Sequence, residues 1–79
     1  MTNIEIYSKD NCGYCEMAVK LADMNKLEYT LKKLDKDFTR EELLEKFPRA
    51  KTFPVVTVNG GVIGGFTEFK TYISNRHSN

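Results

Sequence analysis

Hydrophobic and polar positions in the first half of the chain follow two different periods. Residues 3–7 alternate between apolar and polar side chains and are rich in β-formers, which predicts a strand. From Gly13 to about Asn25 the polar residues recur every three or four positions, which predicts a helix with one solvent-facing side. Residues 28–33 predict a second strand, polar enough to lie near the edge of a sheet. The chain therefore opens as strand, helix, strand.

A second helix has a well-marked start. Thr39 and Glu42 have the spacing of a capping box, and Phe38 and Leu43 stand at the two flanking positions of a hydrophobic staple. The helix should span about residues 40–47, because a proline follows and the residue before a proline avoids the α region.

The last third of the chain predicts a hairpin and a final helix. The strands at 55–58 and 61–63 flank Asn59-Gly60, a pair suited to a tight turn with positive φ at both centres. Apolar residues then recur at helical spacing from Phe66, which predicts a helix to about Ser74 and a frayed polar tail at 75–79.

This order of elements predicts an α/β architecture. The first two strands are joined through a helix, so they should be parallel, whereas the hairpin adds an antiparallel pair. A four-stranded mixed sheet flanked by three helices, on both of its faces, follows from this order. With 79 residues, the chain has the size of a single domain covering 1–79.

Acidic and basic residues are almost balanced, with 12 Lys and Arg against 11 Asp and Glu. There is thus no electrostatic footprint for nucleic acid. The first residues lack the basic and apolar regions of a signal peptide, and no apolar run approaches the ~18 residues of a membrane-spanning helix. We therefore expect the reducing cytoplasm as the compartment and small-molecule or protein partners. We also expect a monomer.

Cys12 and Cys15 stand where the first strand gives way to the first helix. Such a C-x-x-C pair could hold half of a zinc site, staple the chain, or cycle between dithiol and disulfide. Zinc needs four ligands, and the other soft candidate is His77 in the polar tail. A bridge over two residues closes a very short loop, so it stabilises little. The redox interpretation is favoured, because the pair lies beside a β-α-β pattern.

A disulfide exchanger needs one cysteine that is a thiolate at neutral pH. We expect Cys12 to be this nucleophile, because a helix N-terminus lowers a thiol pKa from about 8.5 to between about 3.5 and 7.5. Cys15, one turn further on, would be the resolving thiol. Tyr14 offers either a wall for a substrate or only an exposed aromatic ring. Lys9 could supply positive charge to the thiolate or to a substrate carboxylate. The alternative is that Lys9 is only an exposed lysine of the loop.

Thr52-Phe53-Pro54 is a second feature with two interpretations. Proline at the start of a strand is often only a boundary residue. A cis Phe53-Pro54 bond would instead turn the N–H and C=O of Phe53 outward, where a peptide-like substrate could pair with them.

Gly64-Gly65 before Phe66-Thr67-Glu68 is a third such feature. The glycines permit close backbone approach, and the start of the following helix presents N–H groups to an anion. The alternative is a plain turn with Thr67 as a cap.

Together these features resemble the glutaredoxins, a branch of the thioredoxin fold, over nearly the whole chain. Ile4–Lys9 leading into Cys12-Gly13-Tyr14-Cys15 is similar to the family's first strand and active-site loop. Thr52-Phe53-Pro54 resembles its Thr-Val-Pro segment with a cis proline, and Ile63–Phe66 resembles its glycine pair. The short chain and the Ile-Gly-Gly-Phe sequence are also similar to bacterial and phage members.

The resemblance implies a thioredoxin-like fold and a dithiol glutaredoxin that reduces protein disulfides or glutathione mixed disulfides, with glutathione as the reductant and no metal. The implied glutathione contacts are Lys9 and Lys51 for the glycine carboxylate, Phe53 for the cysteinyl unit, Tyr14 and Pro54 as groove walls, and N–H groups around Phe66 and Thr67 for the γ-glutamyl carboxylate. Thr52 and Gly65 belong to the same set. Ribonucleotide reductase is one target, by family analogy alone.

The sequence departs from the family pattern at two positions. Proline is common where Gly13 stands, and some members without it bind a [2Fe-2S] cluster between two subunits. An aspartate is common near the position of Glu68, whose side chain is longer. The residue Gly13 therefore motivates one alternative, a [2Fe-2S] cluster carrier or sensor. Two others stay open: a thioredoxin-like donor recharged by a flavin reductase, and a non-enzymatic interaction module.

Overall fold

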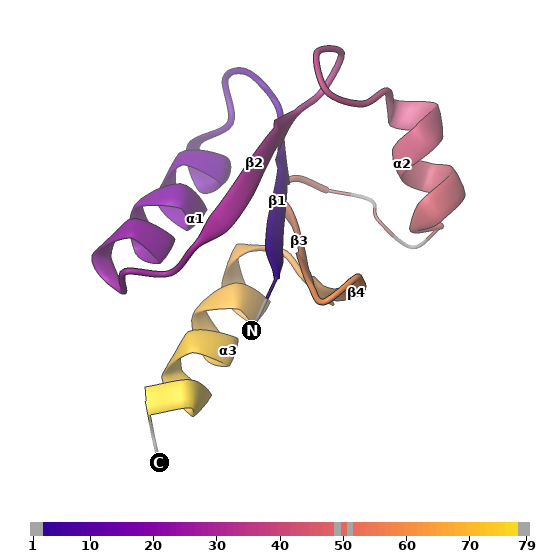
Figure 1. Ribbon diagram of the computed structural model, residues 1–79. Coiled ribbons are helices and arrows are strands. Elements are labelled where there is room, and N and C mark those ends of the chain that lie inside the picture. The colour runs from indigo at the N-terminus through magenta and orange to yellow at the C-terminus, as the bar shows by residue number, and fades with distance from the viewer. Residues whose placement is uncertain (1–2, 49, 51, 78–79) are drawn as a thin grey trace.

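The computed structural model describes residues 3–48, 50 and 52–77. Its elements occur in the order predicted from the sequence (Figure 1). They are β1 (Ile4–Ser8), α1 (Gly13–Met24), β2 (Tyr29–Lys33), α2 (Arg40–Lys46), β3 (Val55–Val58), β4 (Gly61–Gly64) and α3 (Phe66–His77).

One predicted boundary is wrong. The tail expected from Asn75 onward is helical as far as His77, beyond the end predicted at Ser74. The polar composition suggested fraying, but no glycine or proline interrupts the chain there, so each further residue continues the helix with one more hydrogen bond.

The four strands form one mixed sheet in the order β2-β1-β3-β4. β1 runs parallel to β2, with Ile6 opposite Leu31, and antiparallel to β3, with Ile6 opposite Val56. β3 and β4 form the predicted antiparallel hairpin. The polar strand β2 lies at an edge, as its composition indicates.

The Asn59-Gly60 turn closes the hairpin and also holds the start of β1. Both residues have positive φ, 52° and 87°, as a two-residue turn of this kind requires. The Asn59 N–H donates to the Asn3 carbonyl over 2.7 Å, and the Asn3 N–H donates to Oδ1 of Asn59 over 2.8 Å. The turn is therefore tied to a residue far away in the sequence.

One core lies between the sheet and the two longer helices. Figure 1 shows α1 and α3 on one side of the sheet and α2 on the other. Phe69 of α3 is fully buried in this core, and Ala18 and Ala22 let α1 approach the strands closely because their side chains are small. The buried members are Ile4, Ile6, Ala18, Ala22, Val56, Phe69 and Ile73.

A second, smaller core lies on the face of the sheet covered by α2. It consists of Tyr7, Phe38, Leu43 and Val55. The predicted capping box is confirmed: Thr39 Oγ1 accepts the Glu42 N–H over 3.2 Å, and a carboxylate oxygen of Glu42 accepts the Thr39 N–H over 3.1 Å. Both staple residues belong to this core, so the start signal of α2 also attaches the helix to the sheet.

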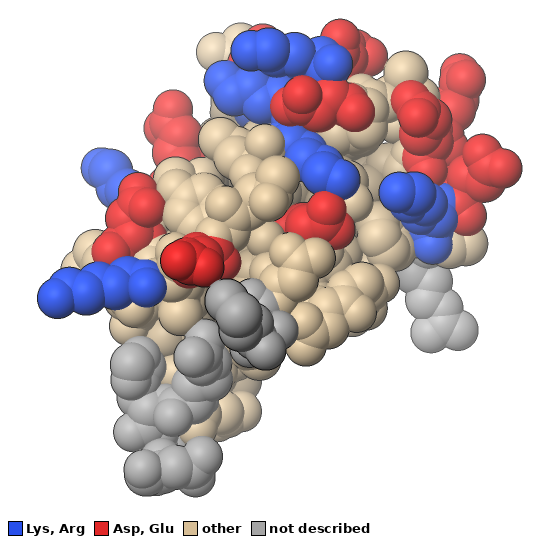
Figure 2. All heavy atoms as spheres, viewed as in Figure 1, with Lys and Arg blue, Asp and Glu red and all other residues tan. Residues whose placement is uncertain are grey.

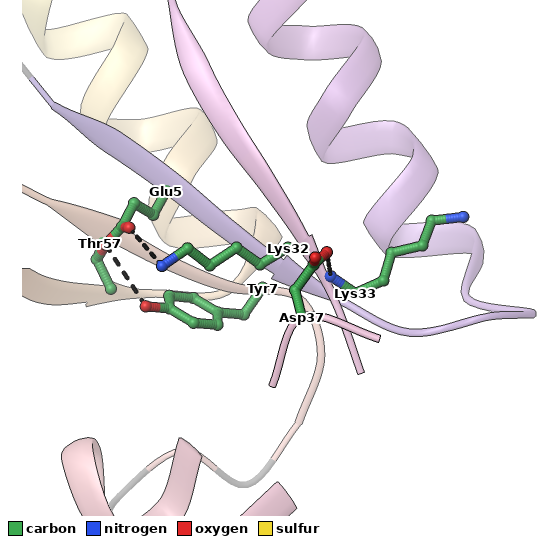
Figure 3. Close-up of polar contacts among 6 residues, drawn as sticks. All are labelled: Glu5, Tyr7, Lys32, Lys33, Asp37 and Thr57. Carbon is green, nitrogen blue, oxygen red and sulfur yellow. Dashed lines mark hydrogen bonds and ion pairs between the residues drawn. The ribbon is translucent and has the colours of Figure 1, made fainter. Parts of the chain in front are cut away.

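The rest of this sheet face carries an ion pair (Figure 3). Lys32 Nζ lies 2.8 Å from Oε2 of Glu5, and the hydroxyls of Tyr7 and Thr57 donate to Oε1 over 3.5 and 3.4 Å. The hydrogen bond from Lys32 lowers the pKa of Glu5, and the same bond raises the pKa of Lys32. The pair thus favours the charged form of both groups.

The visible surface has no field of a single sign. Figure 2 shows acidic and basic side chains interspersed over the face drawn. Within the described ranges, every helix is too short or too polar to cross a bilayer.

Candidate active site

The two cysteines lie at the start of α1, immediately after the loop that follows β1. Cys12 is the N-cap, with an extended backbone (φ −121°, ψ 103°), and its Sγ accepts the N–H of Cys15 over 3.2 Å. Cys12 is partly exposed, whereas Cys15 is only 3% exposed. The two are joined as a disulfide. The helix terminus therefore offers a hydrogen bond and a favourable dipole to negative charge on the accessible sulfur.

The Phe53-Pro54 peptide bond is cis, as the family resemblance implies. Pro54 is buried, Phe53 is partly buried and Thr52 is exposed. Lys9 Nζ lies 5.7 Å from the centroid of the Phe53 ring, within the range of a cation–π contact. This segment therefore presents backbone and a cation beside the cysteines.

A groove of about 820 Å³ joins these features. The predicted site residues that line it are Lys9, Cys12, Tyr14, Thr52, Phe53, Pro54, Gly65, Phe66 and Thr67. The structure thus brings together, beside the accessible sulfur, residues from three separate parts of the chain. Lys51, also predicted, lies outside the described residues.

The start of α3 forms one end of this groove. The Gly65 N–H donates to Oε1 of Glu68 over 2.8 Å, so Glu68 caps the helix from within. A Cβ on Gly65 would lie 3.2 Å from the Pro54 carbonyl oxygen, which shows how closely the two backbone segments approach. The first N–H groups of a helix lack acceptors within the helix. In α3 these include the N–H groups of Phe66 and Thr67, two residues that line the groove.

The rings of Tyr14 and Phe66, two groove residues, are in contact with each other. Their ring centroids are 5.9 Å apart, and Tyr14 is 62% exposed. The Tyr14 ring thus lines the groove and is also well exposed, so its role toward a substrate stays a prediction.

Sequence reasoning did not find the side of the groove formed by α2. Arg40 is the first residue of α2, and Leu44 is 40% exposed. The capping box located the start of this helix but not the direction from which it approaches the cysteines. The groove residues that the sequence did not single out are Asn11, Arg40, Leu43, Leu44 and Ala50, whereas Gly13 and Glu68, which also line the groove, stand at the two positions where the sequence departs from the family pattern.

A second groove, of about 510 Å³, adjoins the first. It is formed by the β1–α1 loop, α1 and β2, and among the described residues Cys12 borders both grooves whereas Cys15 borders only this one. A molecule bound in the first groove would therefore meet Cys12 and not Cys15.

The mixed sheet, the C-x-x-C pair at the N-terminus of α1 and the cis proline in the same groove define a dithiol protein of the thioredoxin fold. More narrowly, the chain belongs to the glutaredoxin family, because the Glutaredoxin family model matches residues 4–63.

Curated relatives include the mitochondrial glutaredoxin-2 of Homo sapiens, 39% identical over 71 residues, and that of Bos taurus, 38% identical over 69 residues. The matches cover 82% of this chain but only 42% and 43% of those proteins, so the chain spans about two fifths of their length.

Solved structures show the same fold. Glutaredoxin 1 of Francisella tularensis, complexed with cacodylate, superposes with a TM-score of 0.78 at 21% identity and full coverage of both chains. A buckwheat glutaredoxin–glutathione complex gives a TM-score of 0.77 at 28% identity, covering 94% of this chain and 70% of that one.

Proposed function

We propose that this protein is a thiol–disulfide oxidoreductase that uses glutathione as its reductant. The observation that carries the proposal is the position of Cys12 Sγ, which accepts the Cys15 N–H at the start of α1 and opens into the first groove. A thiolate at this position is stabilised by the helix terminus and is accessible to a substrate disulfide.

The reaction consists of successive exchanges in which each new S–S bond replaces another. In the reduced protein, the Cys12 thiolate attacks a substrate disulfide, and one substrate sulfur leaves as a thiolate. Cys15 then attacks Cys12, so the second substrate sulfur leaves and the Cys12–Cys15 disulfide forms. A glutathione thiolate attacks Cys12 and releases Cys15. A second glutathione attacks the bound one, which gives oxidised glutathione and restores the Cys12 thiolate.

The first groove suits a short peptide with carboxylates at both ends. Lys9 and Arg40 supply positive charge to this groove, and the start of α3 offers N–H groups. Because β3 begins at Val55, the Phe53 backbone lies outside the strands, where a cysteinyl unit could pair with it. The buckwheat glutaredoxin, solved as a glutathione complex, supports this choice of ligand.

The proposal is tested by separating the two cysteines. With a mixed disulfide of glutathione and 2-mercaptoethanol, Cys12→Ser should abolish turnover, whereas Cys15→Ser should retain it because glutathione itself can release the bound glutathionyl group. With a protein disulfide, Cys15→Ser should lose most activity. If Cys12→Ser remained active and Cys15→Ser were inactive, the roles would be reversed. Coupling to glutathione reductase or to a flavin thioredoxin reductase distinguishes the two reductants.

Reduction of ribonucleotide reductase is a proposal that rests on the family resemblance, and location in the cytoplasm is a proposal that rests on the sequence alone. The first requires that the reduced protein restore activity to an oxidised ribonucleotide reductase, with Cys12→Ser as the inactive control. The second requires that a tagged full-length protein fractionate with cytoplasmic markers.

A further inference from the structure

In the proposed function the ligand pairs with the backbone of Phe53, which does not belong to any strand of the sheet. β3 begins at Val55, so Phe53 precedes the strand and no ladder of inter-strand hydrogen bonds fixes its N–H and C=O. Its side chain packs against the smaller core and the proline that follows is buried, so both help to hold this segment in the groove.

The Phe53 ring rests on another aromatic ring. The centroids of Phe53 and Phe38 are 6.3 Å apart, and the planes are tilted by 31°. Phe53 also carries the Lys9 ammonium 5.7 Å from its centroid. The position of the Phe53 ring therefore affects two groups of the first groove, the Phe53 backbone and the Lys9 ammonium.

Phe38 is itself firmly held. Its side chain is only 8% exposed and meets the buried ring of Tyr7 edge-on, with centroids 5.1 Å apart and planes at 76°. Its carbonyl oxygen accepts the Asp35 N–H over 2.6 Å, and the capping box of α2 begins at the next residue, Thr39. Phe38 is thus fixed by its ring and by the peptide that joins it to Thr39.

We propose that Phe38 is a positioning residue for the glutathione site: its ring sets where Phe53, and through it Lys9, meet the ligand. This inference rests on the proposed function. Phe38 lies in the smaller core rather than among the groove residues, so its effect should act on ligand binding and leave the sulfur chemistry of Cys12 unchanged.

The cluster offers a matched control. Phe47 also meets Tyr7 edge-on, at 5.6 Å and 70°, and packs against the same core. The described aromatic contacts place Phe38, not Phe47, against Phe53. Phe38→Leu and Phe47→Leu thus remove similar packing but only the first removes the support of Phe53.

The experiment compares these variants with the wild-type protein in glutathione-coupled turnover of the 2-mercaptoethanol mixed disulfide. Phe38→Leu should raise KM about two- to tenfold, the range that an aromatic pair supplies, with little change in kcat. Phe47→Leu should leave KM unchanged. In both variants the rate of Cys12 alkylation by iodoacetamide without glutathione should match that of the wild type.

A double-mutant cycle tests the route through Phe53. In a Phe53→Leu background, Phe38→Leu should no longer change KM, because the ring that it supports is gone. Equal KM shifts in Phe38→Leu and Phe47→Leu, or undiminished shifts in the double variant, would overturn the inference. An inactive wild-type protein would instead refute the proposed function.

A measurement on the protein without ligand keeps the inference testable if a leucine variant folds poorly or if the reductant is not glutathione. In two-dimensional NMR of the reduced protein, the Phe53 amide resonance should shift more in Phe38→Met than in Phe47→Met. If the two shifts were alike, Phe38 would not position this segment, whatever the ligand.

Discussion

Gly64, the last residue of β4, has no room for a side chain. Its φ is +131°, a conformation that L side chains rarely adopt. A Cβ there would lie 2.5 Å from Cγ and 2.7 Å from Cβ of Glu68. Gly64→Ala therefore both strains the backbone and displaces Glu68, whose carboxylate caps α3 through the Gly65 N–H.

The expected cost is the sum of two terms. A residue held in a disfavoured backbone region costs about 1–3 kcal/mol. Loss of the hydrogen bond between Glu68 and Gly65 adds about 0.5–1.5 kcal/mol. Gly64→Ala should thus lower the free energy of unfolding by about 1.5–4.5 kcal/mol, a large share of the 5–15 kcal/mol typical of a domain.

The assay is urea unfolding followed by far-ultraviolet circular dichroism at neutral pH. Gly61→Ala, in the same strand, is the matched control, because its Cβ would meet only the Val58 carbonyl at 3.7 Å, an ordinary contact. In a Glu68→Ala background, Gly64→Ala should cost about 1 kcal/mol less, because the capping hydrogen bond is already lost there and only the Cβ of residue 68 still crowds the new methyl group. A cost below about 0.5 kcal/mol for Gly64→Ala, or an equal cost in both backgrounds, would refute this reasoning.

Three other predictions concern stability. Because the pKa of Glu5 is lowered from 4.5 chiefly by Lys32, their contribution is present at neutral pH and lost as the pH falls through the folded value. Unfolding free energy measured against pH should therefore fall less steeply in acid for Lys32→Met than for the wild type. Thr39→Ala should cost about 1 kcal/mol of stability in urea, Thr39→Ser much less, and equal losses would argue against the cap. Gly13→Pro should stabilise by about 0.4–1 kcal/mol, because a Cβ there meets no atom within 4 Å and proline suits the first helical turn. Anaerobic reconstitution of both proteins tests the [2Fe-2S] alternative: a colourless monomer from the Gly13 protein would remove it.

Local signals determined most of the secondary structure. The capping box at Thr39, the Asn59-Gly60 turn and the alternation in β1 act within a few residues, so each element was predicted at nearly its observed place. The end of α3 was missed because a polar tail does not by itself stop a helix. The position of Cys12 at a helix start also followed from sequence, since strand and helix patterns meet there.

The groove depends on contacts between distant residues, and only the tertiary structure decided these. The smaller core carries α2 beside the cysteines and so brings Arg40 and Leu44 to the groove, although no spacing in the sequence relates them to Cys12. Phe38 supports Phe53 for the same reason, because the two residues meet only through the packing of separate segments against Tyr7 and the sheet. A hydrogen-bonded cap is specified by its neighbours in sequence, whereas the walls of a binding site are specified by which faces pack together.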